Sequence, residues 1–419
     1  MTKRILFRAV LLCGAVVAST SLANAQAVQR TYVDLTGSAG YSTNPGLSLR
    51  DDDVGSAFGR LSLNGVHAWR TERSSTSLSA YLENSYYPNR YGNKQLFDLN
   101  ASTNYQTSET VRIFGRVSFS GDFGGQLGTR FIGAPVIPPP PTTTPTDPNA
   151  PPPVIAPDPT VPPPTSVVDL DPDALRGRQF RLSGTGGVSI RPNARDTWSL
   201  SAGASRIFYP NSDRDYTSYS ANGGYSRQLS ERVSVGGRIG LTRADYRGSD
   251  STTLITPQVT ISALLAENWS ANAAVGVSYR NRDFAGDSNS SVGLAVDGSV
   301  CRALEMSRLC ARVSRSSQNS VSADLLTNTS AGLDYSLTLD QNSSIQLSGN
   351  YIHYDGRRIL NRSVSSNYFV TSAAYNRRIN DRLSGGVNGS FRKLSQFGPD
   401  PDSDASASVF LRYRFGDLQ

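Results

Sequence analysis

The sequence predicts an all-β protein, a transmembrane antiparallel up-and-down β-barrel of about eighteen strands, within a range of 16–18. Apolar and polar side chains alternate over runs of roughly ten residues, for example at 111–119, 233–241 and 269–279. A tilted strand needs this length to cross a bilayer, and it exceeds the usual length of a soluble strand. Beyond residue 25, no stretch approaches the 18 continuous apolar residues of a transmembrane helix. We therefore expect strands with one face toward lipid and one toward a wet lumen.

The clearest strand is at the end of the chain, at residues 405–415. Its alternate residues, which include Val409, Leu411 and Phe415, are small or apolar, and Arg412 and Arg414 fall on the other face. Side chains alternate across a strand, so this segment separates an apolar from a polar environment. Alone it fits a soluble sandwich or a membrane barrel equally well. In a barrel we expect it to pair with the first strand, around residues 32–41, and close the sheet without a free edge.

Short acidic turns decide between these two folds. They separate the alternating runs and recur about every 35 to 41 residues once one long insertion is set aside. A regular period indicates a repeated unit, and this unit is long enough for a β-hairpin with one tight turn and one longer loop. An even strand count then puts both chain ends on the periplasmic side. The acids that mark the turns are Glu72, Glu109, Asp196, Glu231, Glu267, Glu305, Asp340 and Asp381.

Aromatic residues are placed as expected for two membrane interfaces. Trp69, Trp198 and Trp269 each lie two or three residues from a short turn, so all three fall at the same end of the barrel. Tryptophan favours a membrane–water boundary, where its ring is in oil and its N–H is wet. The alternative is that aromatic residues are simply common in strands. We expect a second aromatic girdle at the opposite strand ends, formed by Tyr86, Tyr87, Phe208, Tyr209, Tyr246 and Phe284.

The first 25 residues have the form of a secretory signal peptide. Lys3, Arg4 and Arg8 precede an apolar run at 9–18, and Ala23-Asn24-Ala25 has the small-x-small form of a cleavage site. We expect cleavage after Ala25 and a barrel that comprises residues 26–419. Removal of three basic residues lowers the formal net charge from +7 to +4, so the basic balance of the whole chain partly reflects the signal.

A proline-rich insertion occupies residues 134–173 and holds 16 of the 23 prolines. Proline cannot donate to a strand ladder, so this low-complexity segment lies outside the sheet, where polyproline II conformations are expected. The alternation places it in an outer loop between the fifth and sixth strands. One interpretation is a disordered loop, and another is a spacer or plug that reaches a surface partner or folds back over the lumen.

Two cysteines flank one short turn. Cys301 and Cys310 lie symmetrically about Glu305 and Met306, so they face each other across an antiparallel pair. Their Cβ atoms are then close enough for a bridge after small adjustment, and the periplasm is oxidising. We predict a disulfide here. A metal site is disfavoured because no histidine is nearby.

Inward-facing arginines are the best functional candidates. A ladder of arginines inside a pore favours anions and acidic substrates. The alternative is that they pair with inward acids such as Asp297 and Glu83 and hold the lumen together. Arg315 breaks the alternation because it shares the parity of Leu309 and Val313, and we expect it to lie past the end of its strand. The lumen-lining candidates are Arg112, Arg116, Arg238, Arg280, Arg312, Arg412 and Arg414.

No catalytic site, cofactor or metal is expected. The chain has only His67 and His353, and neither has the partners that a nucleophilic hydrolase needs. The acid clusters at 51–53 and at Asp400, Asp402 and Asp404 could hold Ca²⁺ or bridge lipopolysaccharide through cations. Solvated loop carboxylates are the alternative that we favour.

The combination of signal, turn period and aromatic-ended last strand resembles the porin-like outer-membrane β-barrels of Gram-negative bacteria. Such chains usually stop at the final aromatic, whereas Gly416-Asp417-Leu418-Gln419 follow Phe415 here. The segment Gly40-Tyr41-Ser42-Thr43-Asn44-Pro45 is similar to an aromatic-x-x-Asn-Pro pattern in a subset encoded near exopolysaccharide synthesis and export genes.

This resemblance implies a location in the outer membrane and a pore for hydrophilic or anionic solutes, with an accessory role in exopolysaccharide export. The alternative is a structural or adhesive surface barrel whose proline-rich loop binds a partner. The implied partners are outer-membrane lipid, lipopolysaccharide, the barrel-insertion machinery and polysaccharide export components. No nucleic acid partner and no enzymatic activity are expected.

Overall fold

The structure is a computed structural model that describes residues 28–45, 47, 55–89, 92–123, 178–210, 215–247, 251–284, 287–319, 325–359, 362–395 and 402–417. The expected signal peptide (1–25), the proline-rich insertion (134–173), the acids at 51–53 and Asp400 lie outside these residues. Among the described residues, no helix is long and apolar enough to cross a membrane.

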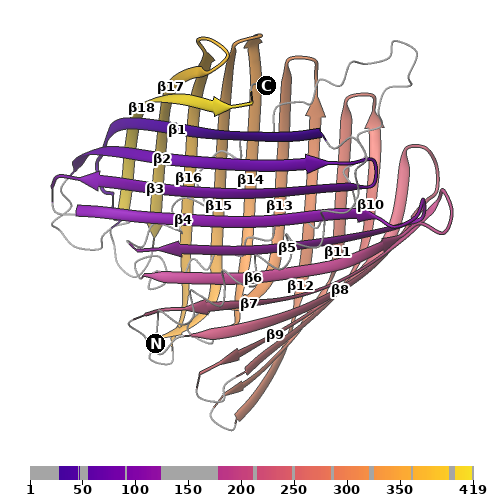
Figure 1. Cartoon of the computed structure of the whole chain (residues 1–419). Coiled ribbons are helices and arrows are strands. Elements are labelled where there is room, and N and C mark those ends of the chain that lie inside the picture. The colour runs from indigo at the N-terminus through magenta and orange to yellow at the C-terminus, as the bar shows by residue number, and fades with distance from the viewer. Residues whose placement is uncertain are drawn as a thin grey trace, which may run out of the picture.

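Eighteen antiparallel strands form one sheet in which each strand pairs with the next, and β1 also pairs with β18 to close the barrel (Figure 1). The predicted fold class is confirmed. The strands are β1 (Val28–Ser42), β2 (Ser56–Arg70), β3 (Ser74–Tyr87), β4 (Gly92–Gln106), β5 (Val111–Asp122), β6 (Gln179–Ile190), β7 (Asp196–Phe208), β8 (Tyr216–Gln228), β9 (Val233–Tyr246), β10 (Ser251–Ala266), β11 (Trp269–Phe284), β12 (Asp287–Ala303), β13 (Ser307–Asn319), β14 (Leu325–Asp340), β15 (Ser343–Ile359), β16 (Arg362–Arg378), β17 (Leu383–Ser395) and β18 (Asp402–Gly416).

The predicted alternation becomes two faces of the barrel wall. On the outer face of β18, Val409 is 59% exposed and Leu411 53% exposed, whereas Asp404 on the inner face is 1% exposed. Residues directly opposite in a strand pair share a face, so the register assigns inner and outer positions on every strand from those of β18. Apolar side chains therefore form a belt on the outer wall, and polar and charged side chains line the inside.

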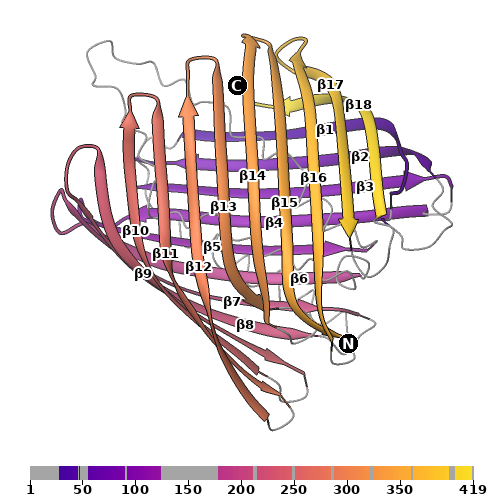
Figure 2. The same ribbon diagram turned by 180° about the vertical axis from the view of Figure 1, so that it is seen from behind.

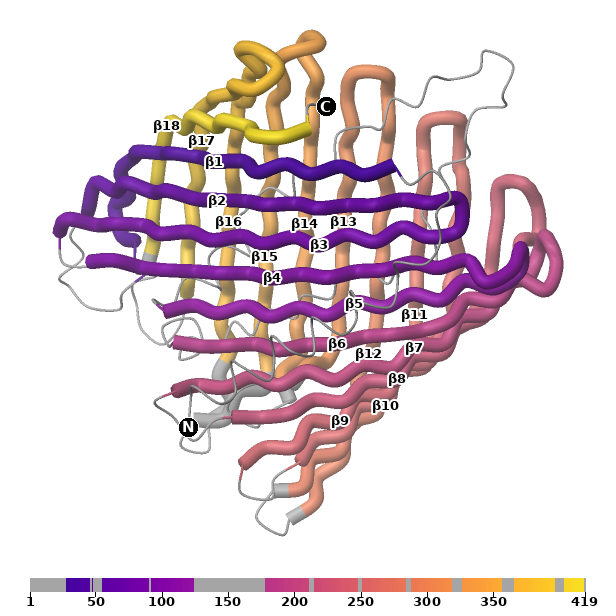
Figure 3. The backbone as a smooth tube through the Cα atoms, viewed as in Figure 1, coloured from indigo at the N-terminus to yellow at the C-terminus, as the bar shows by residue number. Residues whose placement is uncertain are grey.

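The first and last strands pair as expected. The register runs from Tyr32↔Gly416 to Ser42↔Ser406, and Figure 3 shows β18 beside β1. Gly416 and Asp417, which follow Phe415, take part in this closure. The Thr31 N–H donates to the Asp417 carboxylate at 2.5 Å, and the Asp417 N–H donates to the Thr31 carbonyl at 2.8 Å. Gly416 adopts a φ of 89°, a left-handed conformation that glycine allows without strain.

The three tryptophans lie on the outer face beside short turns. Trp198 is 53% exposed, the Trp69 ring lies 5.2 Å from the His67 ring, and the Arg302 guanidinium lies 5.5 Å from the Trp269 ring centre. Their contact with a membrane interface stays a prediction.

The predicted outer girdle is wrong for three of its residues. Tyr87, Tyr209 and Tyr246 are 5%, 6% and 9% exposed and share the parity of the inner face. Tyr87 packs on Phe58, with ring centres 5.7 Å apart. Proximity to a strand end does not determine the face of a residue, whereas strand parity does. Tyr86 is 51% exposed on the outer face, where Phe208 also lies, and the Phe284 side chain is outside the described part.

The predicted disulfide between Cys301 and Cys310 is confirmed. The two residues are directly opposite in the β12–β13 ladder, with Cα atoms 4.1 Å apart. The bridge therefore closes the part of this strand pair that lies next to the short turn.

The ladder between β12 and β13 is shorter than its neighbours. It runs only from Ala303↔Arg308 to Val296↔Arg315, although both strands continue toward the outer loops. Figure 2 shows the lower ends of β13 and β14 curving away from those of β11 and β12. The expected position of Arg315 past a strand end is wrong, because it lies within β13 opposite Thr329 of β14.

Candidate functional site in the barrel lumen

All seven predicted arginines lie on the inner face by strand register. Arg414 makes the best-defined contact: its guanidinium donates two hydrogen bonds of 2.7 Å to the buried Asp34 carboxylate. The same guanidinium lies 4.1 Å from the centre of the Tyr32 ring. This ion pair joins β1 to β18, so the Arg414 charge stabilises the closure of the barrel.

The other arginines divide by their partners. Arg312 is ion-paired with Asp334 on the neighbouring strand. Arg238 instead donates to the neutral side-chain oxygen of Gln258 at 2.7 Å, and Arg412 lies 5.9 Å from the Phe410 ring centre.

The remaining three candidates are on β5 and β11. Arg116 is exposed on the inner face opposite Ser102, and Arg112 lies four residues nearer the short turn. Arg280 donates from Nη1 to the Thr327 hydroxyl of β14 at 2.9 Å. The expected salt bridges are thus present for Arg312 and Arg414, whereas Arg116, Arg238 and Arg412 form no ion pair with an acid among the described residues. A lumen-lining role for the seven stays a prediction.

Arg60 and Arg392 are inner-face arginines that the candidate set does not include. Arg60 pairs with Glu83 at 3.3 Å, and Arg392 pairs with Asp404 at 2.5 Å. Of the acids expected to pair inward, Glu83 does so, but with Arg60. Strict application of the two-residue period to β2 and β17 would have placed both arginines inside.

Asp404 is the centre of a hydrogen-bond network at the barrel end opposite the short turns. Its carboxylate accepts hydrogen bonds from the Ser42 hydroxyl at 2.6 Å and from the Asn44 N–H at 2.9 Å, and Arg392 donates to it from Nε at 3.1 Å. The interpretation of Asp404 as a solvated loop acid is therefore wrong. It begins the inner face of β18 and is 1% exposed.

After β1, the described residues 43–45 and 47 turn toward the lumen. Leu47 is 5% exposed and packs in a cluster with Tyr368, Val370 and Leu394, which lie on the inner faces of β16 and β17. Leu47 has a φ of 45°, a left-handed backbone that is uncommon for a branched residue. Leu47 therefore covers part of the inner wall at the barrel end opposite the short turns, and the nearby Asn44 is held by Asp404.

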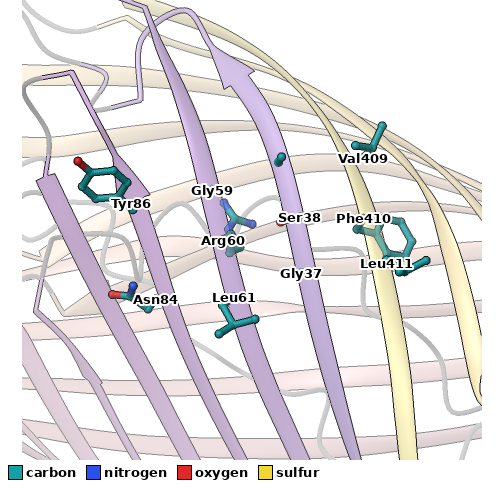
Figure 4. A pocket seen from close by; sticks show the side chains of 11 residues that line it. Gly37, Ser38, Gly59, Arg60, Leu61, Asn84, Tyr86, Val409, Phe410 and Leu411 are labelled. Carbon is teal, nitrogen blue, oxygen red and sulfur yellow. The ribbon is translucent and has the colours of Figure 1, made fainter.

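The outer wall carries a hollow of about 590 Å³ at the junction of β18, β1 and β2. Figure 4 shows Leu61, Val409 and Leu411 around backbone at Gly37 and Gly59. A Cβ atom at either glycine would meet nothing within 4 Å. The lining is mainly apolar, as expected for a surface that contacts acyl chains.

The described residues contain no cluster of three or more His, Cys, Asp or Glu side chains that could hold a metal ion. The His67 ring is hydrogen-bonded to the Thr31 hydroxyl at 2.6 Å, and the His353 ring to the Asn367 side-chain oxygen at 2.7 Å. Both histidines thus have structural partners.

No protein-family model matches the sequence, and no curated protein matches it. Among solved structures, the chain is similar to OccK2 (OpdF) of Pseudomonas aeruginosa, with 10% identity, TM-score 0.47, and coverage of 93% of this chain and 98% of that one. It is also similar to the outer membrane protein OpdK of the same organism, with 10% identity, TM-score 0.43, and coverage of 92% and 99%. For the FrpB iron transporter of Neisseria meningitidis (F3-3 variant) the identity is 8%, the TM-score 0.45 and the coverage 92% and 81%. The assignment of the fold rests on the strand pairing and not on these similarities.

Proposed function

We propose that this chain is a bacterial outer-membrane barrel that forms a passive pore for hydrophilic solutes and prefers anions. Export by residues 1–25, with cleavage after Ala25, is part of this proposal. The observation that carries it is the division of the wall into an exposed apolar outer face and an arginine-bearing inner face. In a membrane, all strand hydrogen bonds of a closed barrel are satisfied internally, so this division suits lipid outside and water inside.

The preference for anions follows from three arginines in particular. Arg238 is bonded to an amide, Arg412 lies over an aromatic ring, and Arg116 is exposed to the lumen. None of these contacts neutralises the guanidinium charge. Positive charges that line a pore raise the local concentration of anions, and they bind carboxylates and phosphates with directed hydrogen bonds.

Planar-bilayer recording under a KCl gradient tests the proposal. We expect open channels with an anion-selective reversal potential, which moves toward zero in the Arg116→Ser/Arg238→Ser/Arg412→Ser variant. The matched control changes three arginines in short turns, Arg195→Ser/Arg232→Ser/Arg382→Ser, and should keep the wild-type selectivity. The selectivity should also weaken as salt rises, because ions screen the lumen charges.

Two results would overturn the proposal. Selectivity that is equal in the lumen variant and the wild type would remove the role of the arginines. A pure, folded protein without channels, even after deletion of residues 134–173, would favour instead the surface barrel whose proline-rich loop binds a partner.

An accessory role in exopolysaccharide export is a finer proposal that rests on residues 40–45 alone. In this segment Asn44 is 2% exposed, and its N–H donates to Asp404. This contact with Asp404 therefore gives an account of the asparagine that involves no polysaccharide. Acidic oligosaccharides added to the bilayer chamber would test the finer role, because a bound solute should block the current.

A further inference from the structure

The β12 edge is left without a ladder partner near its outer end. Continuation of the observed register would pair Ala295 with Ser316 and Leu294 with Ser317, yet the β12–β13 ladder ends at Val296↔Arg315. Over the same length β12 still pairs with β11, and β13 still pairs with β14. We call this gap, between residues 292–295 of β12 and 316–319 of β13, the β12–β13 seam.

The outer end of β13 turns inward and overlies the neighbouring strands. The Ser317 hydroxyl lies 3.0 Å from the Ser278 hydroxyl of β11, although β12 lies between these strands in the sheet. Arg280 of β11 likewise reaches Thr327 of β14. Ser278 is 0% exposed and Ala295 1% exposed, as expected for inner-face residues covered by a second layer.

The cause lies in the parity of the sequence. Arg315, Ser317 and Thr327 occupy positions that would face lipid if the wall were continuous. Polar and charged side chains are costly on the lipid face of a barrel, so this part of the hairpin is more stable when it folds inside. On β12, in contrast, Val292 and Leu294 remain on the outer wall and are 66% and 53% exposed.

Arg280 lies inside the overlap with bonding capacity to spare. Among the described residues its Nε is buried without a hydrogen-bond partner, while Nη1 is bonded to Thr327. The charges that act on it are Arg315, which repels it, and Asp355, which attracts it. A Cβ atom at Gly293 would lie 3.1 Å from its Nη2, so the glycine leaves room for the guanidinium. Arg315 donates from Nη1 to Thr329 at 3.1 Å and is exposed.

Only the outer end of the seam, at Val292, lies at the level where lipid headgroups are expected, and Arg315 is opposite Val296, nearer the short turn. The outer face of β11 is apolar or small from Trp269 to Tyr279, and Tyr279 is opposite Val292. Ten residues of strand at a typical tilt rise about 24 Å, close to the usual height of about 25 Å for the apolar band of an outer-membrane barrel. With Trp269 at the inner interface, Val292 reaches the outer one.

We propose that the β12–β13 seam binds the phosphate-bearing headgroup of an outer-leaflet lipid. Arg280 and Arg315 hold the phosphate, which bridges two cations that otherwise repel each other, and the acyl chains lie on Val292 and Leu294. Guanidinium groups suit phosphate because they present several N–H donors in a planar fork. The inference rests on the proposed membrane location but does not require that the barrel conducts.

Lipid retention by the purified, folded full chain tests the site. The probes are lipid A with its phosphates, dephosphorylated lipid A, and inorganic phosphate as competitor, with bound lipid measured by native mass spectrometry. We expect Arg280→Gln/Arg315→Gln to weaken binding of phosphorylated lipid A about tenfold, or about 1.4 kcal/mol. The control Arg195→Gln/Arg232→Gln removes the same charge from two short turns and should bind like the wild type.

Several outcomes would overturn the proposal. The first is equal binding by the seam variant and the control variant, and the second is binding of dephosphorylated lipid A as strong as that of phosphorylated lipid A. The third is displacement of the lipid by inorganic phosphate at a concentration as low as that of the lipid, which would indicate a site for free anions. If the glutamine variant does not fold, Arg280→Lys/Arg315→Lys keeps the charges and should lose affinity by a smaller factor. Channel recording of the same samples is independent, so failure of the pore and failure of the lipid site are distinguishable.

Discussion

Two junctions in the barrel wall differ in how completely they are closed. The β1–β18 junction joins the two ends of the chain, yet its ladder holds from Tyr32↔Gly416 to Ser42↔Ser406. The β12–β13 junction joins strands only three residues apart in sequence, yet its ladder stops at Val296↔Arg315. Proximity along the chain therefore does not decide which junction closes.

The side chains on each face account for the difference. At the β1–β18 junction the outer face carries Ala39, Val409 and Leu411, and inside it the Asp34–Arg414 ion pair joins the strands. At the β12–β13 junction the outward positions near the outer loop are polar on β13 and apolar on β12. The outward side chains of β12 are stable in lipid and those of β13 are stable in water, so the two strand ends separate.

Removal of the ion pair at the β1–β18 junction should have the largest effect. Arg414→Ala leaves the Asp34 carboxylate, which is 5% exposed, without its cation. Loss of one partner of a buried pair costs about 3–5 kcal/mol. We expect the urea concentration at the midpoint of unfolding to fall sharply. The fraction of folded barrel at each urea concentration is measured from its mobility in gels.

The matched variant for this prediction is Arg412→Ala, which loses only a contact with the Phe410 ring and should cost about 1 kcal/mol. Addition of Asp34→Asn to Arg414→Ala should restore part of the stability, because the unpaired charge is then gone. Equal unfolding midpoints for the two single variants would contradict a special role for the ion pair.

The disulfide should have a smaller effect, confined to the β12–β13 junction. Cys301→Ser/Cys310→Ser removes a bridge that closes a short loop, worth at most about 2–3 kcal/mol. The separation of the strands can then extend from the seam toward the short turn. Hydrogen exchange of the amides at 296–303 should be faster than in the wild type, while exchange at the β1–β18 junction is unchanged. Unaltered exchange at 296–303 would show that the bridge does not limit the separation.

The sequence was sufficient to predict the strand number, the closing pair and the disulfide, because these depend on the two-residue period and on spacing. It was not sufficient for the outer mouth. The burial of Asp404 depends on contacts with Ser42 and Asn44 at the other end of the chain, and that of Leu47 on packing with Tyr368, which spacing does not reveal. For Tyr87 and Tyr246, in contrast, parity alone indicates the inner face, so the lipid girdle is wrong for them on the sequence itself.

The partners of the inner-face arginines also could not be predicted from the sequence. Parity alone places Arg238, Arg312 and Arg414 on the inner face, but it does not reveal which of them meets an acid. That depends on register, which sets Asp34 opposite Arg414 and Asp334 within reach of Arg312. Arg315 appeared as an exception to the alternation, and this exception marks the seam.

Cysteine cross-linking compares the two junctions most directly, in the Cys301→Ser/Cys310→Ser background. Ala39→Cys/Val409→Cys probes the β1–β18 ladder, Leu294→Cys/Ser317→Cys probes a continuous β12–β13 wall, and Ser278→Cys/Ser317→Cys probes the inward overlap. The structure predicts that the first and third pairs form disulfides under mild oxidation and that the second does not. Efficient bridging of the second pair, without bridging of the third, would show a continuous wall and contradict the seam.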